Sequence, residues 1–278
     1  MTRVRKNLVP SDQEMPDQGM NAAWEHLQSE AVSLVTEAAA AGVTLRVVGS
    51  AGIRLHCPRP GPVMDQLGRP AKDIDFIVPQ QHRKGMRRLL ESRGYVADRD
   101  LLIAMEGTRY TFTHSGHGTD IDVFVERLDF CHTIEVRDRL GVHPVTIPLE
   151  ELLLQKIQIV EMTTTDVIDI SVLLATHDVG GEGGEAETID SGYIARLLAR
   201  DWGFHHTAVR NLRRIRDDGG GPAVSDLGEP SRGLVRDRAG RLLAAIDAEP
   251  KSLAWRMRDR IGERKQWWQD VDDKEATY

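Results

Sequence analysis

The stretch Val43–Val78 constrains the fold more than any other part of the chain. Its apolar start predicts a buried strand at Leu45–Val48 that stops at Gly49-Ser50 and leads into a short helix from Ala51. A loop rich in proline and glycine follows at Cys57–Ala71. The order strand, Gly-Ser turn and helix is typical of a site that binds a phosphate at the start of the helix.

A second strand in the same stretch carries Asp73 and Asp75, two residues apart. Because alternate residues of a strand point to the same face, the two carboxylates are expected to lie side by side. Such a pair repels and loses hydration unless a cation lies between the two groups. With the turn at Gly49-Ser50 facing it, the pair indicates a phosphate-and-metal site.

A second acidic pair, Asp120 and Asp122, begins a later predicted strand, Ile121–Val125. If the two acidic strands are neighbours, at least three carboxylates converge, which is enough to hold two Mg²⁺ ions. Asp122 is the expected third ligand, because the apolar run that anchors the strand follows it directly. Asp120, at the mouth of the strand, is expected to be solvated.

The overall composition is that of a globular protein with a substantial core. The chain has 278 residues, of which 40% are hydrophobic and 28% charged, so it can hold one large domain or two ordinary ones. Its net charge of −7 argues against broad nonspecific binding of nucleic acids. Two cysteines give no disulfide framework, and no apolar run is long enough to span a membrane. We therefore expect a cytoplasmic protein without a membrane partner.

The pattern along the chain changes from mixed elements to helices at Pro148. We predict a flexible tail at residues 1–19, a mixed α/β domain at 20–148 and a helical domain at 149–278. Further strands are predicted at Leu101–Met105, Arg109–His114, Thr133–Val136 and Val145–Ile147. Helices are predicted at 21–42, 80–92, 149–160, 166–175, 189–199, 207–216, 234–248 and 251–268, with Thr163–Thr165 as a cap.

Lys156 and Asp169 are the notable charged residues of the helical half. Lys156 lies on a helix with apolar side chains on several sides, and Asp169 lies within the apolar run VIDISVLL. A buried carboxylate there needs a partner, and Lys156 is the natural one. A solvated lysine is the alternative interpretation.

The order Gly49-Ser50, Asp73-x-Asp75 and then Asp122 resembles the DNA-polymerase-β-type nucleotidyltransferase superfamily. The helical continuation, LLLQKIQIVE followed by TTTDVIDISVLL, is similar to the AbiE-type and related toxin-like bacterial nucleotidyltransferases. The resemblance covers roughly residues 40–270. It departs from the family pattern in the long loop Cys57–Ala71 and in Thr165, where the AbiE-type motif has a basic residue.

This resemblance implies a fold, an activity and partners. The fold is a small mixed β-sheet core at 20–148 with flanking helices, followed by the helical half. The activity is Mg²⁺-dependent transfer of NMP from an NTP, such as ATP, to a hydroxyl or phosphate acceptor by a two-metal mechanism. The acceptor would be a tRNA 3′ end, a protein or a small molecule, and a toxin-like enzyme would have a cognate antitoxin.

The resemblance also implies residue roles. Gly49 and Ser50 would hold the phosphates of the nucleotide. Asp73 and Asp75 would ligate Mg²⁺, and Asp122 would complete the metal site or act as a base. Lys156 would contact phosphate, with Asp169 orienting it.

The sequence fits other functions less well. A nucleotide-binding regulatory module could keep the fold without turnover, but the intact set at Ser50, Asp73, Asp75 and Asp122 favours an enzyme. The chain lacks the histidine ligand set of a metal-dependent phosphohydrolase. His114 and His117 are expected to lie in a solvent-exposed turn rather than bind metal. The arginine-rich helices near 210–216 and 251–265 are consistent with solvated helix faces or with a surface that faces RNA.

Overall fold

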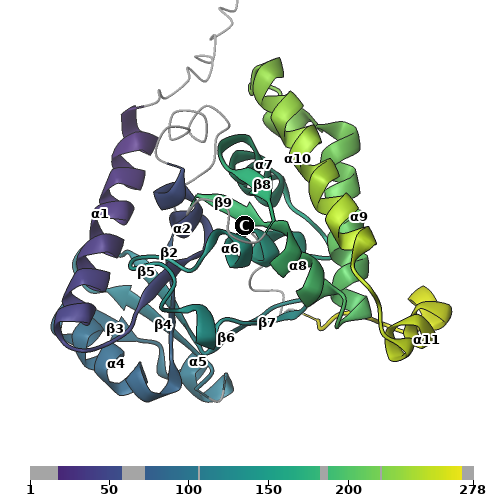
Figure 1. Ribbon diagram of the computed structural model, residues 1–278. Coiled ribbons are helices and arrows are strands. Elements are labelled where there is room, and N and C mark those ends of the chain that lie inside the picture. The colour runs from purple at the N-terminus through teal and green to yellow at the C-terminus, as the bar shows by residue number, and fades with distance from the viewer. Residues whose placement is uncertain (1–17, 58–72, 106, 182–186, 220, 271–278) are drawn as a thin grey trace, which may run out of the picture.

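The computed structural model describes residues 18–57, 73–105, 107–181, 187–219 and 221–270. The predicted tail at 1–19 and the predicted loop Cys57–Ala71 lie almost entirely outside these residues. The fold within them is mixed α/β with a helical C-terminal half, which confirms the predicted fold class (Figure 1). The predicted domain boundary at residue 148 stays a prediction.

A five-stranded mixed sheet forms the centre of the N-terminal half. Its strands, in spatial order, are β1 (Arg46–Val48), β2 (Asp73–Val78), β5 (Asp120–Val125), β4 (Arg109–His114) and β3 (Tyr95–Ala97). The pair β2–β5 is parallel, and every other pair is antiparallel. The two acidic strands are therefore direct neighbours at the middle of the sheet.

Helices pack against this sheet. They are α1 (Gln18–Ala40), α2 (Gly49–His56), α4 (Arg83–Ser92) with the 3-10 turn η1 (Gln80–His82) before it, and α5 (Arg99–Ala104). The apolar side of α1, including Trp24 and Leu34, joins one core cluster with Ile74 and Phe76 of β2. Burial of these side chains fixes which face of β2 is apolar, so its acidic residues must lie on the opposite face.

The helical half contains α6 (Leu149–Ile157), α7 (Thr164–Thr176), α8 (Ser191–Leu198), α9 (Trp202–Asp218), α10 (Glu229–Ala248) and α11 (Leu253–Ile261). Three 3-10 turns, η2 (Arg137–Arg139), η3 (Gly221–Val224) and η4 (Gly262–Arg264), lie between or after the helices. Two short ribbons complete the described chain, β6 (Arg127–Asp129) with β7 (Thr133–Glu135) and β8 (Asp178–Gly180) with β9 (Thr188–Asp190).

The second core cluster joins this half to the sheet. Val48 of β1 and Ile53 of α2 belong to it together with residues of α6 and α7. This packing holds α6 next to α2, which matters for the site described below. No helix in the described part of the chain is long and apolar enough to cross a membrane.

Two predicted strands were wrong. Leu101–Ala104 belongs to the helix α5 and Met105 is its C-cap, because the side chain of Asp98 caps the start of the helix by accepting hydrogen bonds from the backbone N–H groups of Asp100 and Leu101. Val145–Ile147 forms only a single bridge, Thr146 with Val47, at the edge of the sheet. The helix predicted from Lys251 also ends early, at Ile261, where Gly262 takes a positive φ of 58°.

Two buried histidines should make the stability of the fold depend on pH. Burial lowers the pKa of His56 and of His132 from 6.5 to about 4. Because the folded pKa lies below the unfolded one, protonation favours the unfolded chain. Stability should be full above about pH 6.5 and fall toward pH 4, by up to ~1.4 kcal/mol per pH unit for each histidine.

Urea unfolding between pH 7.5 and 4.5 measures this dependence. A His56→Gln/His132→Gln double variant should lose less stability over that range than the wild type. An equally steep decline in the double variant would show that other groups cause the acid sensitivity.

Candidate metal centre

The parallel pairing of β2 with β5 places four aspartates in two cross-strand rows. Asp73 lies opposite Asp120, and Asp75 lies opposite Asp122. The intervening residues of both strands, such as Ile74, are fully buried on the other face of the sheet. The alternation that buries them puts all four carboxylates on one face.

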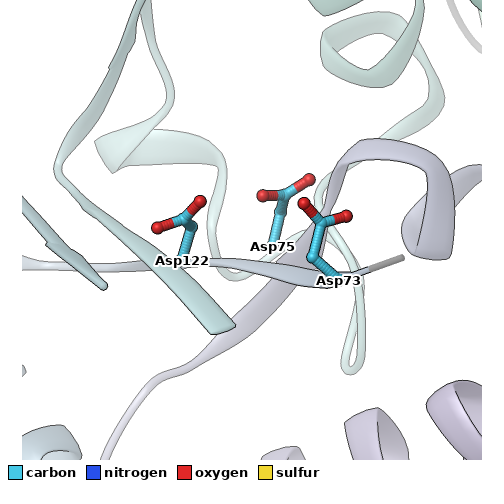
Figure 2. Close-up of side chains that lie close together, drawn as sticks. All are labelled: Asp73, Asp75 and Asp122. Carbon is cyan, nitrogen blue, oxygen red and sulfur yellow. The ribbon is translucent and has the colours of Figure 1, made fainter. Parts of the chain in front are cut away.

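Three of these carboxylates converge. One oxygen from each of Asp73, Asp75 and Asp122 lies within 4.8 Å of the other two, and Figure 2 shows the three side chains rising side by side from the two strands. Among the described residues, no other set of metal-ligating side chains comes together in this way. Asp120 is exposed and accepts a hydrogen bond from Thr113 Oγ1 at 2.6 Å. The structure thus brings together the three residues that the sequence singled out.

The electrostatics at Asp75 fit a bound cation. Burial, followed by the charges of Asp73 and Asp122, raises the pKa of Asp75 well above its usual value of 3.8. The nearby cations Lys156 and Arg109 act in the opposite direction. Three hard carboxylate oxygens on rigid strands are a suitable donor set for Mg²⁺ or Mn²⁺, and a divalent cation would remove the repulsion among them.

Gly49 lies directly against Asp75 of this triad, and Ser50 follows it in the chain. They form the first turn of α2, which begins at Gly49 rather than at the predicted Ala51. Gly49 has a positive φ of 64°, and its N–H donates a hydrogen bond to Gln155 Oε1 of α6 at 3.0 Å. Ser50 is buried, with 7% of its surface exposed. The turn is therefore held from the helical half of the chain.

Glycine at position 49 is required by the closeness of Asp75. A Cβ atom built on Gly49 would lie 2.1 Å from Asp75 Oδ2, so any side chain must displace that carboxylate. We expect Gly49→Ala to lower stability by roughly 1–3 kcal/mol, from strain at positive φ plus this clash. Urea unfolding measures the loss.

Gly42→Ala is the matched control for this variant. Gly42 has a similar φ of 70°, but its added Cβ would have no atom within 4 Å. It therefore reports the cost of the backbone conformation alone. If the two variants lost the same stability and Gly49→Ala left metal binding intact, the contact with Asp75 would have no bearing on the site.

Lys156 of α6 forms the ion pair expected from the sequence. Its Nζ lies 3.0 Å from Asp169 Oδ2 and 3.3 Å from Asp166 Oδ1, both on α7. Asp169 is fully buried, and 13% of the Lys156 side chain is exposed. Asp166 also forms the capping box of α7 with Thr163, as predicted for the cap at Thr163–Thr165. This network holds the ammonium group near the triad.

Sequence reasoning missed Arg109 and Thr111 of β4 and Gln155 of α6. Arg109 Nη2 donates to Asp122 Oδ2 at 2.7 Å, and Thr111 Oγ1 donates to Asp122 Oδ1 at 2.5 Å. The alternation of polar and apolar residues in RYTFTH places Arg109 and Thr111 on the same face of their strand. Once β4 pairs with β5, Thr111 lies opposite Asp122.

The other sequence candidates lie outside the triad. His114 is the half-buried last residue of β4, so only His117 lies in the predicted exposed turn. The two rings stack with centroids 3.6 Å apart, and His117 Nδ1 is hydrogen-bonded to Thr119 Oγ1. In the arginine-rich helices, Arg210 donates to Val160 O, and Arg258 donates to Gly262 O and lies over the ring of Trp202. An RNA-facing surface stays a prediction.

No protein-family model matches the chain, and no curated protein sequence matches it. Three solved structures are similar to it. The structure described as a "putative nucleotidyltransferase from H. pylori" has 10% identity and a TM-score of 0.38, covering 85% of this chain and 100% of that one. An antigenic nucleotidyltransferase-like protein from Paracoccidioides brasiliensis has 12% identity and a TM-score of 0.31, covering 83% and 96%.

The third structure is the CdnC:HORMA-deltaN complex of E. coli MS115-1, with 12% identity, a TM-score of 0.28 and coverage of 84% and 86%. All three TM-scores are below 0.5.

Proposed function

We propose that this chain is a metal-dependent nucleotidyltransferase of the DNA-polymerase-β type, with its active centre at Asp73, Asp75 and Asp122. The observation that carries the proposal is the convergence of these three carboxylates from two adjacent parallel strands, with oxygens within 4.8 Å of one another. The contact of Gly49 with Asp75 supports it, because it places the start of α2 against the same carboxylates.

The three carboxylates would hold Mg²⁺, which would stabilise the charge of the triphosphate and favour the alkoxide form of the attacking hydroxyl. Asp73 and Asp75 come from one strand, so their spacing is fixed by the strand itself. Asp122 comes from the next strand and would complete the set. Ordered strands keep all three oxygens in place before substrate arrives, which lowers the cost of assembling the transition state.

The residues around the triad have roles that follow from their positions. Gly49 and Ser50 would receive the phosphates, because the start of a helix favours anions. The ammonium group of Lys156 is near enough to the triad to lower the pKa of Asp75. From that position it would contact a phosphate of the bound nucleotide. Asp169 would orient that ammonium through its 3.0 Å contact.

An assay of nucleotidyl transfer to separate pools of acceptors tests this function. The protein is incubated with each α-labelled NTP, Mg²⁺ and separate pools of tRNA, protein or small-molecule hydroxyl compounds. We expect release of pyrophosphate and label in one pool. A toxin-like role with a cognate antitoxin would be indicated by label in tRNA or protein and by growth arrest on expression.

The same experiment separates the enzyme from a non-catalytic nucleotide-binding module. A module would bind an NTP with Mg²⁺ in equilibrium dialysis but release no pyrophosphate with any pool. Absence of both binding and release would contradict the proposed function altogether.

A further inference from the structure

Arg109 is an arginine of β4 that engages a member of the triad. Its Nη2 donates to Asp122 Oδ2 at 2.7 Å, while Thr111 Oγ1 donates to the other oxygen, Oδ1. The side chains of Arg109 and Asp122 are only 20% and 16% exposed. Water therefore screens this ion pair less than it screens a pair on the surface. In this state Asp122 has a counter-ion supplied by the protein.

The position of Arg109 follows from the register of β4 on β5. Thr111 lies opposite Asp122, and Arg109 lies opposite Phe124, one row further along the same face. The guanidinium carbon lies 5.1 Å from the centre of the Phe124 ring. Because a guanidinium group is favourable over an aromatic face, Phe124 offers Arg109 a resting position beside the triad that does not depend on Asp122.

The two cations near the triad differ in what holds them. Lys156 is paired with Asp169 and Asp166, which lie outside the triad. Arg109 is paired with Asp122, which is itself a candidate metal ligand. A divalent cation entering the triad would therefore compete with Arg109 for Asp122, whereas it would leave the ion pairs of Lys156 with Asp166 and Asp169 in place.

Resting on the proposed function, we propose that Arg109 regulates the metal centre by exchange. Without metal its guanidinium neutralises Asp122, and when a divalent cation binds, Asp122 passes from Arg109 to the cation. The guanidinium released beside the triad then binds the phosphates of the incoming nucleotide. Arg109 thus weakens binding of metal alone and strengthens binding of metal together with nucleotide.

The exchange predicts two effects of opposite sign in one variant. In Arg109→Gln, Mn²⁺ should bind about tenfold more tightly in the absence of nucleotide, because a competing positive charge is gone. With saturating Mn²⁺, a non-hydrolysable NTP analogue should bind about tenfold more weakly, because a charge-assisted contact to phosphate is lost. Electron paramagnetic resonance of free Mn²⁺ and equilibrium dialysis of the analogue measure the two affinities without turnover.

Matched variants control for charge and for folding. Arg93→Gln also removes one arginine, but Arg93 pairs with Glu30 and Glu37 of α1, so both affinities should stay at the wild-type value. Circular dichroism checks that each variant is folded. Arg109→Lys keeps the charge but not the planar fork, and it should show a smaller tightening for Mn²⁺. It replaces the glutamine variant if that one does not fold.

A mere structural tether would give a different result. If Arg109 only held Asp122 in place, its loss would misplace a ligand and weaken Mn²⁺ binding. Unchanged or weaker Mn²⁺ binding in the folded Arg109 variants would therefore overturn the exchange. If the wild-type protein bound Mn²⁺ with no dependence on Asp75, the proposed function would fail instead, so the two failures are distinguishable.

Discussion

Replacing Asp75 with asparagine should abolish nucleotidyl transfer and, in the same variant, raise the melting temperature of the metal-free protein. The pKa of Asp75 is raised by burial and by its two acidic neighbours, so the charged form costs stability whenever the pH exceeds the unfolded value of 3.8. Asparagine keeps the shape and removes the charge. The same charge would hold the metal, so transfer should fall by ~10³-fold or more.

Thermal unfolding at pH 8 without divalent cations and label transfer with Mg²⁺ measure the two effects. Asp120→Asn is the matched control, because Asp120 lies on the same face but is exposed and bonded to Thr113. It should leave both properties close to those of the wild type. Transfer that survives in Asp75→Asn, or a lower melting temperature of the metal-free variant, would contradict the assigned role of Asp75.

Replacing Lys156 with methionine should destabilise the protein by ~3 kcal/mol or more. Methionine can fill the space of the lysine stem, but it removes the ammonium 3.0 Å from the fully buried carboxylate of Asp169. A buried charge that loses its counter-ion costs far more than the pair contributes when intact. Urea unfolding measures the loss, and nucleotide affinity should fall in the same variant.

The double variant Lys156→Met/Asp169→Asn separates stability from phosphate binding. Without the buried charge, most of the lost stability should return, because the two residues act as a coupled pair. Nucleotide affinity should stay low, since the ammonium group is still absent. A single variant as stable as the wild type, or a double variant less stable than the single one, would show that Lys156 is not the counter-ion that stabilises the buried carboxylate of Asp169.

Local patterns predicted much of this site. The period-2 alternation around Asp73, Asp75 and Asp122 placed the carboxylates on one face because the apolar residues between them must be buried. The lysine–aspartate pair followed from the cost of a buried charge, which leaves Asp169 few partners. These inferences need only the spacing of residues within an element.

Contacts between distant strands could not be predicted in the same way. That β5 lies parallel to β2, and that β4 lies beside β5, depends on packing across the whole sheet. Arg109 and Gln155 join the site only through those contacts. The helix α5 was missed for a local reason, because the run LLIAM suits a strand or a helix and the cap at Asp98 decided between them.

The most direct test of the central claim is a count of bound Mn²⁺ ions in the presence of a non-hydrolysable NTP analogue, which does not require the acceptor to be known. Electron paramagnetic resonance should show about two Mn²⁺ ions per wild-type chain with the analogue, as expected for a two-metal centre. It should show loss of both in Asp73→Asn and Asp75→Asn and full occupancy in Asp120→Asn. Equal Mn²⁺ binding by all four proteins, or no binding by any of them, would contradict the assignment of Asp73, Asp75 and Asp122 as a nucleotidyltransferase metal centre.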